Sequence, residues 1–222
     1  MNLFYNAVIK QCSDKMSGYL TLMNYRYMNL CVKAEPASLM PVTISFFGEE
    51  KNIEDVAQVG QPDDYHLAVI PQSKEMIDLI AQNIFLAHPE FKLSRKTIEA
   101  GGDNIDYLEY EMPEVDKNRR DFLSQAVKGL HEEAKARIDA VHADQKRGLA
   151  EFIREPSADL DEANNELDKV HEDYITQIRD IRDDKLQEIE DGYMHYLSQN
   201  AKDNPADGNQ TFDVTQSMIM SE

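Results

Sequence analysis

The chain has 222 residues, of which 41% are hydrophobic, and its 42 acidic residues outnumber its 23 basic ones to give a formal net charge of −19. That length suits one large domain or two modest ones. A charge of this sign repels nucleic acid and anionic membranes over long range, so contact with either would need a local basic patch. The lack of tryptophan and the low glycine and proline content favour a helix-rich protein over a sandwich or barrel.

The first thirty residues carry a helical stripe, because apolar residues recur there every three or four positions. Pro36 is expected to end this helix, since the residue before a proline is pushed out of the α region. Cys12 and Cys31 fall in the same pattern, which indicates buried thiols in a reducing compartment rather than a disulfide. We find neither a signal peptide nor a membrane-length apolar run, and we expect a cytoplasmic protein. The stripe consists of Phe4, Val8, Cys12, Met16, Leu20, Met23, Tyr27 and Leu30.

Residues 36–113 have the composition of a small α/β unit, with short β-branched or aromatic runs between turn-forming clusters. Pro113 ends this region. The expected elements are strands at 42–47, 65–70 and 105–110, a helix at 73–87 with Ser73 as its N-cap, and a loop at 99–104.

Two long helices are expected next, separated by Pro156. Asp116 and Asp159 are the expected N-caps, and the second helix should run to about residue 199. A short connection between long amphipathic helices favours an antiparallel hairpin. The first apolar face is Phe122, Ala126, Leu130, Ala134, Ile138, Val141, Leu149 and Phe152. The second is Leu160, Ala163, Leu167, Val170, Tyr174, Ile178, Ile181, Ile189, Tyr193 and Tyr196.

Together these elements predict an α+β fold, a long antiparallel three-helix bundle with an inserted small α/β domain. The bundle domain takes residues 1–31 and 114–200, and the inserted domain takes residues 32–113. Residues 201–222 are polar and are expected to be a flexible tail. Hinges near 31–35 and 111–115 should let the small domain swing about the bundle.

No catalytic, metal or cofactor motif is recognisable in the sequence. The stretch HEEAK, residues 131–135, lacks the second histidine of a zincin helix. The six histidines show no close pair with a third ligand nearby in the sequence, and AGGDN does not join a strand to a helix as a dinucleotide loop would. We therefore expect a protein that is not an enzyme and needs no cofactor.

Two segments carry a more specific pattern. Residues 32–48 read VKAEPASLMPVTISFFG, and residues 118–137 read NRRDFLSQAVKGLHEEAKAR. Both resemble the ribosome recycling factor family, whose segments read GRASPSLLDGIVVEYYG and ERRKDL…VRGEAEQAR. The resemblance covers roughly residues 5–197, apart from extra residues near 88–104 and the tail. The matching positions include Ala34, Pro36, Leu39, Gly48, Arg119, Arg120, Leu123, Val127, Gly129 and Ala134.

The resemblance implies a non-enzymatic translation factor with the split-bundle fold, in which a three-helix bundle is interrupted in sequence by a small α/β domain. Such a factor binds the post-termination ribosome through large-subunit RNA and acts with elongation factor G to separate the subunits. It implies neither a membrane nor a small-molecule substrate. The family's RNA-facing arginines correspond here to Lys33, Arg119, Arg120 and Lys128, which are the expected RNA-binding residues.

Four positions depart from the family's basic pattern, namely Leu30, Asp139, His142 and Ala143. A hydrogen bond to a charged group contributes about 1.5–3 kcal/mol, so these changes predict weakened RNA contacts. The alternative is a diverged paralogue that keeps the fold, no longer recycles ribosomes and serves as a protein-binding or regulatory module. A coiled-coil chaperone is a third hypothesis, but it would not account for the inserted α/β unit.

Each basic candidate also has an ordinary structural explanation. Arg119 and Arg120 lie three and four residues after Asp116, where side-chain ion pairs on a helix contribute about 0.2–0.5 kcal/mol. Lys33 and Lys128 would then be common surface lysines.

Overall fold

The computed structural model describes residues 3–46, 48–152 and 158–203. Its helices are α1 (Leu3–Met28), the 3-10 helix η1 (Pro36–Leu39), α2 (Ile53–Val56), the 3-10 helix η2 (Lys74–Met76), α3 (Ile77–Ala87), α4 (Lys117–Phe152) and α5 (Ala158–Asp203). Its strands are β1 (Thr43–Phe46), β2 (Glu49–Asn52), β3 (Ala57–Asp63), β4 (His66–Pro71), β5 (Lys92–Ala100) and β6 (Asp103–Glu111).

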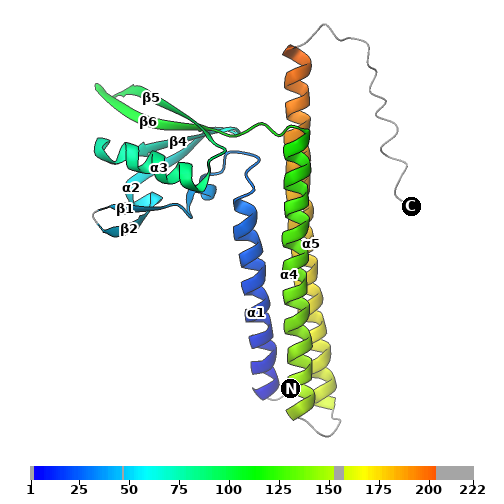
Figure 1. Cartoon of the computed structure of the whole chain (residues 1–222). Helices are drawn as coiled ribbons and strands as arrows, with labels where there is room; N and C mark the ends of the chain where they lie inside the picture. Colours follow the sequence, from blue (N-terminus) through cyan, green and yellow to red (C-terminus); the bar gives the residue numbers. More distant parts are fainter. Residues whose placement is uncertain (1–2, 47, 153–157, 204–222) are drawn as a thin grey trace.

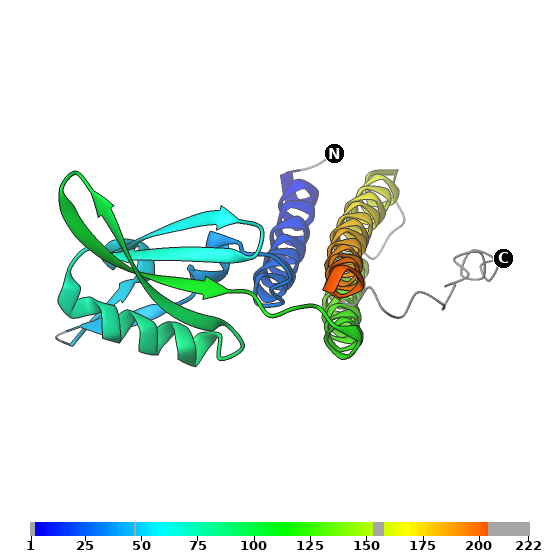
Figure 2. The same ribbon diagram turned by 90° about the horizontal axis from the view of Figure 1, so that it is seen from above.

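Helices α1, α4 and α5 form the long bundle, and the expected fold class is confirmed. Figure 1 shows α4 running in the opposite direction to α1 and α5, with the α/β unit at the end where α1 stops and α4 begins. Seen along the bundle, this unit lies to one side, next to α1 (Figure 2). No helix in the described ranges has the length and apolarity that a membrane crossing requires.

Among the side chains that the structure describes, the bundle core differs from the expected apolar faces by one residue at two places. Phe4 and Phe122 are 41% and 67% exposed, while their neighbours Tyr5 and Leu123 are only 6% and 2% exposed. The expected stripes begin with runs of exact four-residue steps. Each such step turns about 400° around a helix, so four steps drift by about 160° and leave the buried face. Phe4 and Phe122 were therefore placed wrongly in the core.

The ends of the long helices test the expected N-caps. Asp116 is confirmed, because its Oδ1 accepts the backbone N–H of Arg119 at 2.7 Å. Asp159 is wrong, because α5 already begins at Ala158 and Asp159 lies in its first turn. Pro156 and residues 204–222, most of the expected tail, lie outside the described residues, and α5 continues to Asp203.

The inserted unit is built on an antiparallel sheet with strand order β3-β4-β6-β5, beside the two-stranded β1–β2. Ile80 and Ile84 of α3 share a hydrophobic core with Leu67 and Leu108 of the sheet. The strands expected at 42–47, 65–70 and 105–110 are present as β1, β4 and β6, and the expected helix is present as η2 and α3. Ser73 occupies the N-cap position of η2, but its side chain makes no capping bond.

Elements β2, α2, β3 and β5 were not predicted from the sequence, and the prediction of a loop at 99–104 is wrong. Residues 92–99 of β5 are all exposed, so they lack the apolar alternation that marks a half-buried strand. The hairpin turns at Gly101 and Gly102, with φ of 64° and 90°. Two consecutive positive φ angles are those of a type I′ turn, which glycine adopts without strain. The loop is therefore only two residues long.

Both connections between the two parts of the fold pass over α5 at Gly192. A Cβ atom on this glycine would lie 2.7 Å from Val32 Cγ1 and 3.1 Å from Val115 Cγ2. Val32 and Val115 belong to the bundle core, whereas the preceding Cys31 belongs to the core of the α/β unit. The absence of a side chain at Gly192 lets the two hinge segments approach the helix.

Candidate nucleic-acid interface

Arg119 lies at the start of α4 and reaches across to the first hinge. Its Nη2 donates a hydrogen bond of 3.0 Å to the carbonyl oxygen of Cys31. Burial lowers the pKa of Arg119, and the nearby Glu90, Cys31 and Asp116 only partly offset this effect. This contact explains why an arginine stands in the first turn of a helix, where a cation opposes the helix dipole. Its guanidinium holds the end of α1 against the start of α4.

Arg120 instead joins α4 to α5. Its guanidinium carbon lies 4.5 Å from the centre of the Tyr193 ring, a cation–π distance. Its Nε and Nη2 donate to Asp121 Oδ1 at 3.1 and 2.9 Å, and its Nη1 lies 3.9 Å from Glu190. The side-chain ion pairs with Asp116 that formed the structural alternative are therefore wrong for both arginines.

Lys33 and Lys128 are the more accessible candidates. The Nζ of Lys33 lies 4.0 Å from Asp64 Oδ2, and 39% of the Lys33 side chain is exposed. Lys128 is exposed on α4, nine residues after Arg119. Nine residues turn a helix by about 900°, which places Lys128 on the opposite side of α4 from Arg119. The structure thus keeps Lys33, Arg119 and Arg120 near the hinge and separates Lys128 from Arg119 across the helix.

Asp139, one of the four positions that differ from the basic pattern of the family, lies on the seam between α4 and α5. Its carboxylate accepts hydrogen bonds from Lys135 Nζ and from His171 Nε2, both at 2.7 Å. Burial alone would raise the pKa of Asp139, but these two hydrogen bonds outweigh it and hold the pKa below its ordinary value. A lysine and a carboxylate here neutralise each other at the surface of the bundle.

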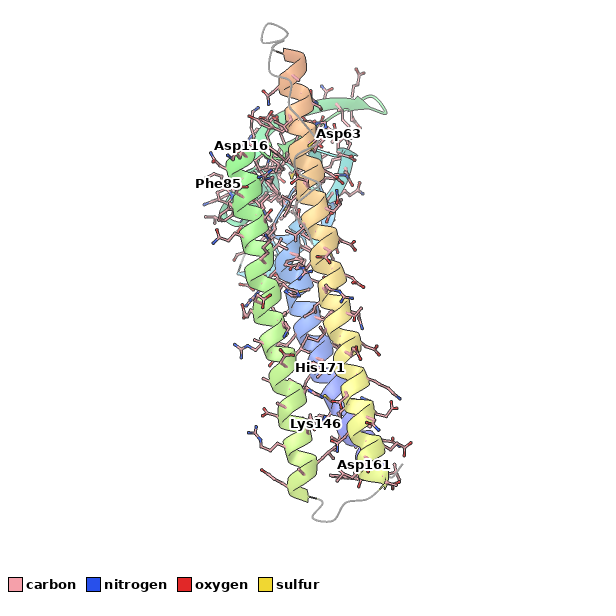
Figure 3. The ribbon with its side chains drawn as sticks, turned by 90° about the vertical axis from the view of Figure 1, so that its right-hand side faces the viewer. Asp63, Phe85, Asp116, Lys146, Asp161 and His171 are labelled. Atoms are coloured by element: carbon pink, nitrogen blue, oxygen red, sulfur yellow. The ribbon has the colours of Figure 1, made fainter. Side chains whose placement is uncertain are left out.

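His142 extends the same seam by one turn. Its ring stacks on that of His171 with 4.4 Å between ring centres, and its Nε2 lies 2.7 Å from Asp168 Oδ1. Asp168 also accepts from Lys146 Nζ at 2.8 Å. Figure 3 shows Lys146 and His171 on this side of the bundle. Where the family's arginines are expected, this chain has an internal network that links α4 to α5.

The other two positions that differ from the family's basic pattern, Leu30 and Ala143, take no part in this network. Leu30 is partly buried and packs against the bundle core. Ala143 is exposed on α4, one residue beyond His142. Neither side chain can carry a positive charge, so neither replaces a phosphate contact.

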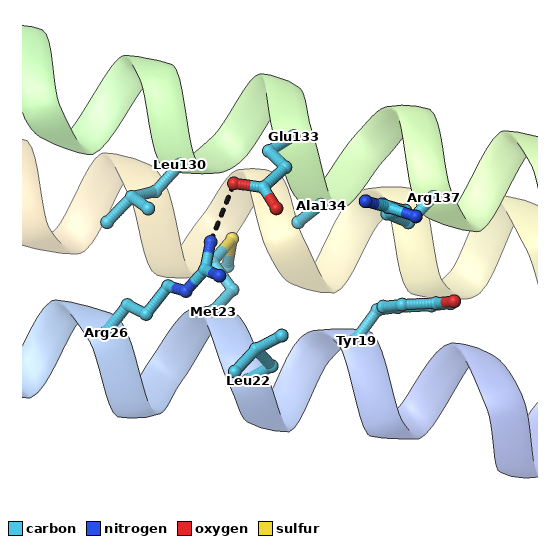
Figure 4. Close-up of a pocket in the computed structure, with 8 residues that line it drawn as sticks. All are labelled: Tyr19, Leu22, Met23, Arg26, Leu130, Glu133, Ala134 and Arg137. Atoms are coloured by element: carbon cyan, nitrogen blue, oxygen red, sulfur yellow. Dashed lines mark hydrogen bonds and ion pairs between the residues drawn. The ribbon is translucent and has the colours of Figure 1, made fainter.

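A groove of about 280 Å³ runs between α1 and α4 and contains two further arginines (Figure 4). Arg26 Nη1 donates to Glu133 Oε2 at 2.6 Å, which pairs one of these charges. Arg137 lies on the other side of Glu133 and is exposed. The groove is lined by Tyr19, Leu22, Met23, Arg26, Leu130, Glu133, Ala134 and Arg137.

Comparison with known proteins identifies the family to which this fold belongs. The model of the family described as "Ribosome recycling factor" matches residues 26–189, which include both hinges, the α/β unit and α4. The chain belongs to the ribosome recycling factor family. The resemblance carried by residues 32–48 and 118–137 is thereby confirmed.

Individual members of the family are distant in sequence. The chain is 25% identical over 160 residues to the chloroplastic ribosome-recycling factor of Oryza sativa subsp. indica, which covers 71% of this chain and 57% of that protein. It is 23% identical over 185 residues to the ribosome-recycling factor of Flavobacterium johnsoniae, covering 82% of this chain and 95% of that one. The match thus spans little more than half of the rice protein and nearly all of the bacterial one.

Solved structures of the family share the fold. A solution structure of a ribosome recycling factor superposes with a TM-score of 0.70 at 16% identity, covering 86% of this chain and 100% of that chain. A chain in models of the T. thermophilus ribosome recycling factor and E. coli elongation factor G bound to the E. coli post-termination complex gives a TM-score of 0.55 at 19% identity, covering 83% and 98%. At these identities the likeness establishes the architecture.

One group in the described part of the chain has the make-up of a metal site, although no motif in the sequence predicts it. Sγ of Cys31, a ring nitrogen of His88 and a carboxylate oxygen of Glu90 all lie within 4.8 Å of one another. Cys31 follows α1, whereas His88 and Glu90 follow α3. Residues so far apart in the chain form no spacing motif, so only the tertiary structure brings them together.

Proposed function

We propose that this protein is a non-enzymatic translation factor of the recycling type, which binds the post-termination ribosome through large-subunit RNA. The observation that carries the proposal is the match of the family model to residues 26–189. We further propose elongation factor G as the partner in subunit separation, because the similar fold in the post-termination models accompanies that protein. The proposed activity needs no cofactor and places the protein with cytoplasmic ribosomes.

The RNA contacts proposed here come from Lys33, Arg119, Arg120 and Lys128. Lys33 and Lys128 have the exposure to reach a phosphate directly. Arg119 would act mainly by fixing the hinge, since its guanidinium binds the Cys31 carbonyl. The hinge segments near 31–35 and 111–115 are the proposed pivots for the inserted domain.

We propose that these contacts are weaker than the family pattern implies. The lysines and histidines of the α4–α5 seam are paired with Asp139 and Asp168. The net charge of −19 adds long-range repulsion from RNA. Each phosphate contact that is lost reduces the salt dependence of log K by about 0.9.

The first test is co-sedimentation with large ribosomal subunits across a salt series. We expect binding at low salt and its loss by about 200 mM, because the remaining attraction depends on a few exposed cations. Lys128→Ala should lower the affinity and reduce the salt slope by about 0.9. Lys10→Ala, an exposed lysine on α1, is the control and should leave both unchanged.

Two outcomes would overturn parts of this proposal. Binding that persists above about 200 mM salt would refute the weakened contacts. No binding at low salt would refute the ribosomal function and favour the protein-binding paralogue. Complementation of a bacterial strain that lacks its own recycling factor then tests recycling itself, with the empty vector as the reference.

The second test restores one missing cation. Ala143→Arg places a guanidinium at an exposed position where the family pattern has arginine. A gained charged hydrogen bond of about 1.5 kcal/mol would strengthen large-subunit binding about tenfold at low salt. Ala150→Arg adds the same charge at another exposed site on α4 and should produce a much smaller change. Equal effects of both substitutions would show that only net charge matters.

A further inference from the structure

The cluster at the first hinge is compact, and two of its three residues are buried. Cys31 and His88 are 4% and 3% exposed, and the third member, Glu90, has a side chain that is 31% exposed. The potential ligand atoms of the three residues lie within 4.8 Å of one another. Cys31 is on the segment that leaves α1, so the cluster joins this segment to the residues that follow α3.

The His88 ring is already oriented as a metal-binding imidazole would be. Its Nε2 lies 3.0 Å from the carbonyl oxygen of Ser38, and because a carbonyl only accepts, Nε2 must carry the hydrogen. This leaves Nδ1 directed at Glu90, with 3.5 Å between Nδ1 and Oε1. Metal-binding histidines commonly donate their second N–H to a backbone carbonyl, which fixes the tautomer and the ring.

We propose that Cys31, His88 and Glu90 bind a zinc ion through Sγ, Nδ1 and a carboxylate oxygen, with water as the fourth ligand. A thiolate, an imidazole and a carboxylate together suit Zn²⁺, whereas Mg²⁺ and Ca²⁺ prefer oxygen ligands only. Zinc bonds of about 2.0–2.3 Å in a tetrahedron separate the ligand atoms by about 3.3–3.7 Å. Side-chain movements of about 1 Å would bring the three atoms to that spacing.

Arg119 lies beside the cluster, but its charge does not exclude the ion. Without metal, burial would lower the pKa of His88, yet hydrogen bonds to Cys31, Glu90 and the Ser38 carbonyl raise it to about 10. Zinc displaces the protons of its ligand atoms to solvent, so the ion is bound by a thiolate, a neutral imidazole and a carboxylate. The two negative ligands offset the two positive charges of the ion, and Arg119 then lies beside a group without net charge.

The bound ion would tie the first hinge to the α/β unit. Cys31 is held on its other side by the Arg119 hydrogen bond to its carbonyl. A metal ion at Sγ would therefore fix both the side chain and the backbone of the residue that immediately precedes the inserted domain. The binding of the ion can be tested without a ribosome, so the outcome of that test does not depend on the proposed ribosomal function.

The test titrates the full chain, first freed of metal with a chelator, with Zn²⁺ in competition with a chromophoric chelator. We expect one tightly bound ion per chain. Titration with Co²⁺ should add a thiolate-to-cobalt absorption band in the near ultraviolet. Cys31→Ser should remove that band and weaken Zn²⁺ binding by at least about 100-fold, more than the loss of an outer hydrogen-bond partner causes. Cys12→Ser, which removes the other buried thiol, should change neither.

A second variant, which leaves the buried cysteine unchanged, separates a loss of zinc binding from a folding defect. Glu90→Gln keeps the shape of a partly exposed side chain, so it should fold normally by circular dichroism while binding Zn²⁺ more weakly. The proposal is overturned if the wild-type chain binds no stoichiometric zinc. It is equally overturned if the cobalt complex shows no thiolate band, or if folded Glu90→Gln and Cys31→Ser chains bind zinc as the wild type does.

Discussion

Leu123→Ala is expected to lower the free energy of unfolding by about 2–5 kcal/mol, whereas Phe122→Ala should change it by less than about 0.5 kcal/mol. Leu123 is 2% exposed in the bundle core, so its truncation leaves a cavity between the helices. Phe122 is 67% exposed, and most of its ring is already in water. The larger side chain thus contributes less stability than its smaller neighbour.

Urea denaturation of the two variants and the wild type, followed by circular dichroism at one temperature, measures this difference. The two positions are adjacent on α4, and both variants place an alanine at almost the same distance from the helix end. A larger loss for Phe122→Ala than for Leu123→Ala would mean that the helix is turned by about one residue relative to its partners.

Gly192→Ala is the second substitution with a large expected effect, a loss of about 1–3 kcal/mol. The new methyl group would lie 2.7 Å from Val32 Cγ1 and 3.1 Å from Val115 Cγ2. Short branched valine side chains cannot swing away from it, so the hinge segments or α5 must move. This strain outweighs the gain of about 1 kcal/mol that alanine otherwise brings to a helix interior.

Gly129→Ala is the matched control for this effect. Gly129 is exposed on α4, and nothing lies within 4 Å of its would-be Cβ. Alanine there should raise the free energy of unfolding by about 0.5–1 kcal/mol. Thermal denaturation of both variants checks the opposite signs, and a stabilised Gly192→Ala chain would refute the close approach of the hinges to α5.

The periodicity of the sequence was enough to predict the existence, order and approximate limits of the long helices. Asp116 was recognisable as an N-cap because that role depends on a residue and its immediate neighbours. The sequence alone did not show whether Phe122 or Leu123 faces the core, because adjacent residues differ by only about 100° around the helix. Which of them faces inward depends on where α1 and α5 lie.

The strands of the sheet were predicted only where their partial burial requires apolar residues in the sequence. Strand β4 has alternating buried residues that show in its composition, whereas residues 92–99 of β5 are exposed throughout. Pairing with β6 holds β5 through backbone hydrogen bonds, which carry no side-chain signature. The two-residue turn at Gly101 and Gly102 then extends both strands beyond the expected loop.

By itself, the sequence determined the split-bundle fold, the family and the loss of arginine at Asp139, His142 and Ala143, since these depend on local periodicity and on residue identity. Only the tertiary structure decided what the remaining charges contact. It directs Arg119 to the Cys31 carbonyl, pairs Asp139 with His171 of the facing helix, and gathers Cys31, His88 and Glu90 at the hinge. Contacts between side chains far apart in the chain depend on how the elements pack, and no spacing within one segment encodes them.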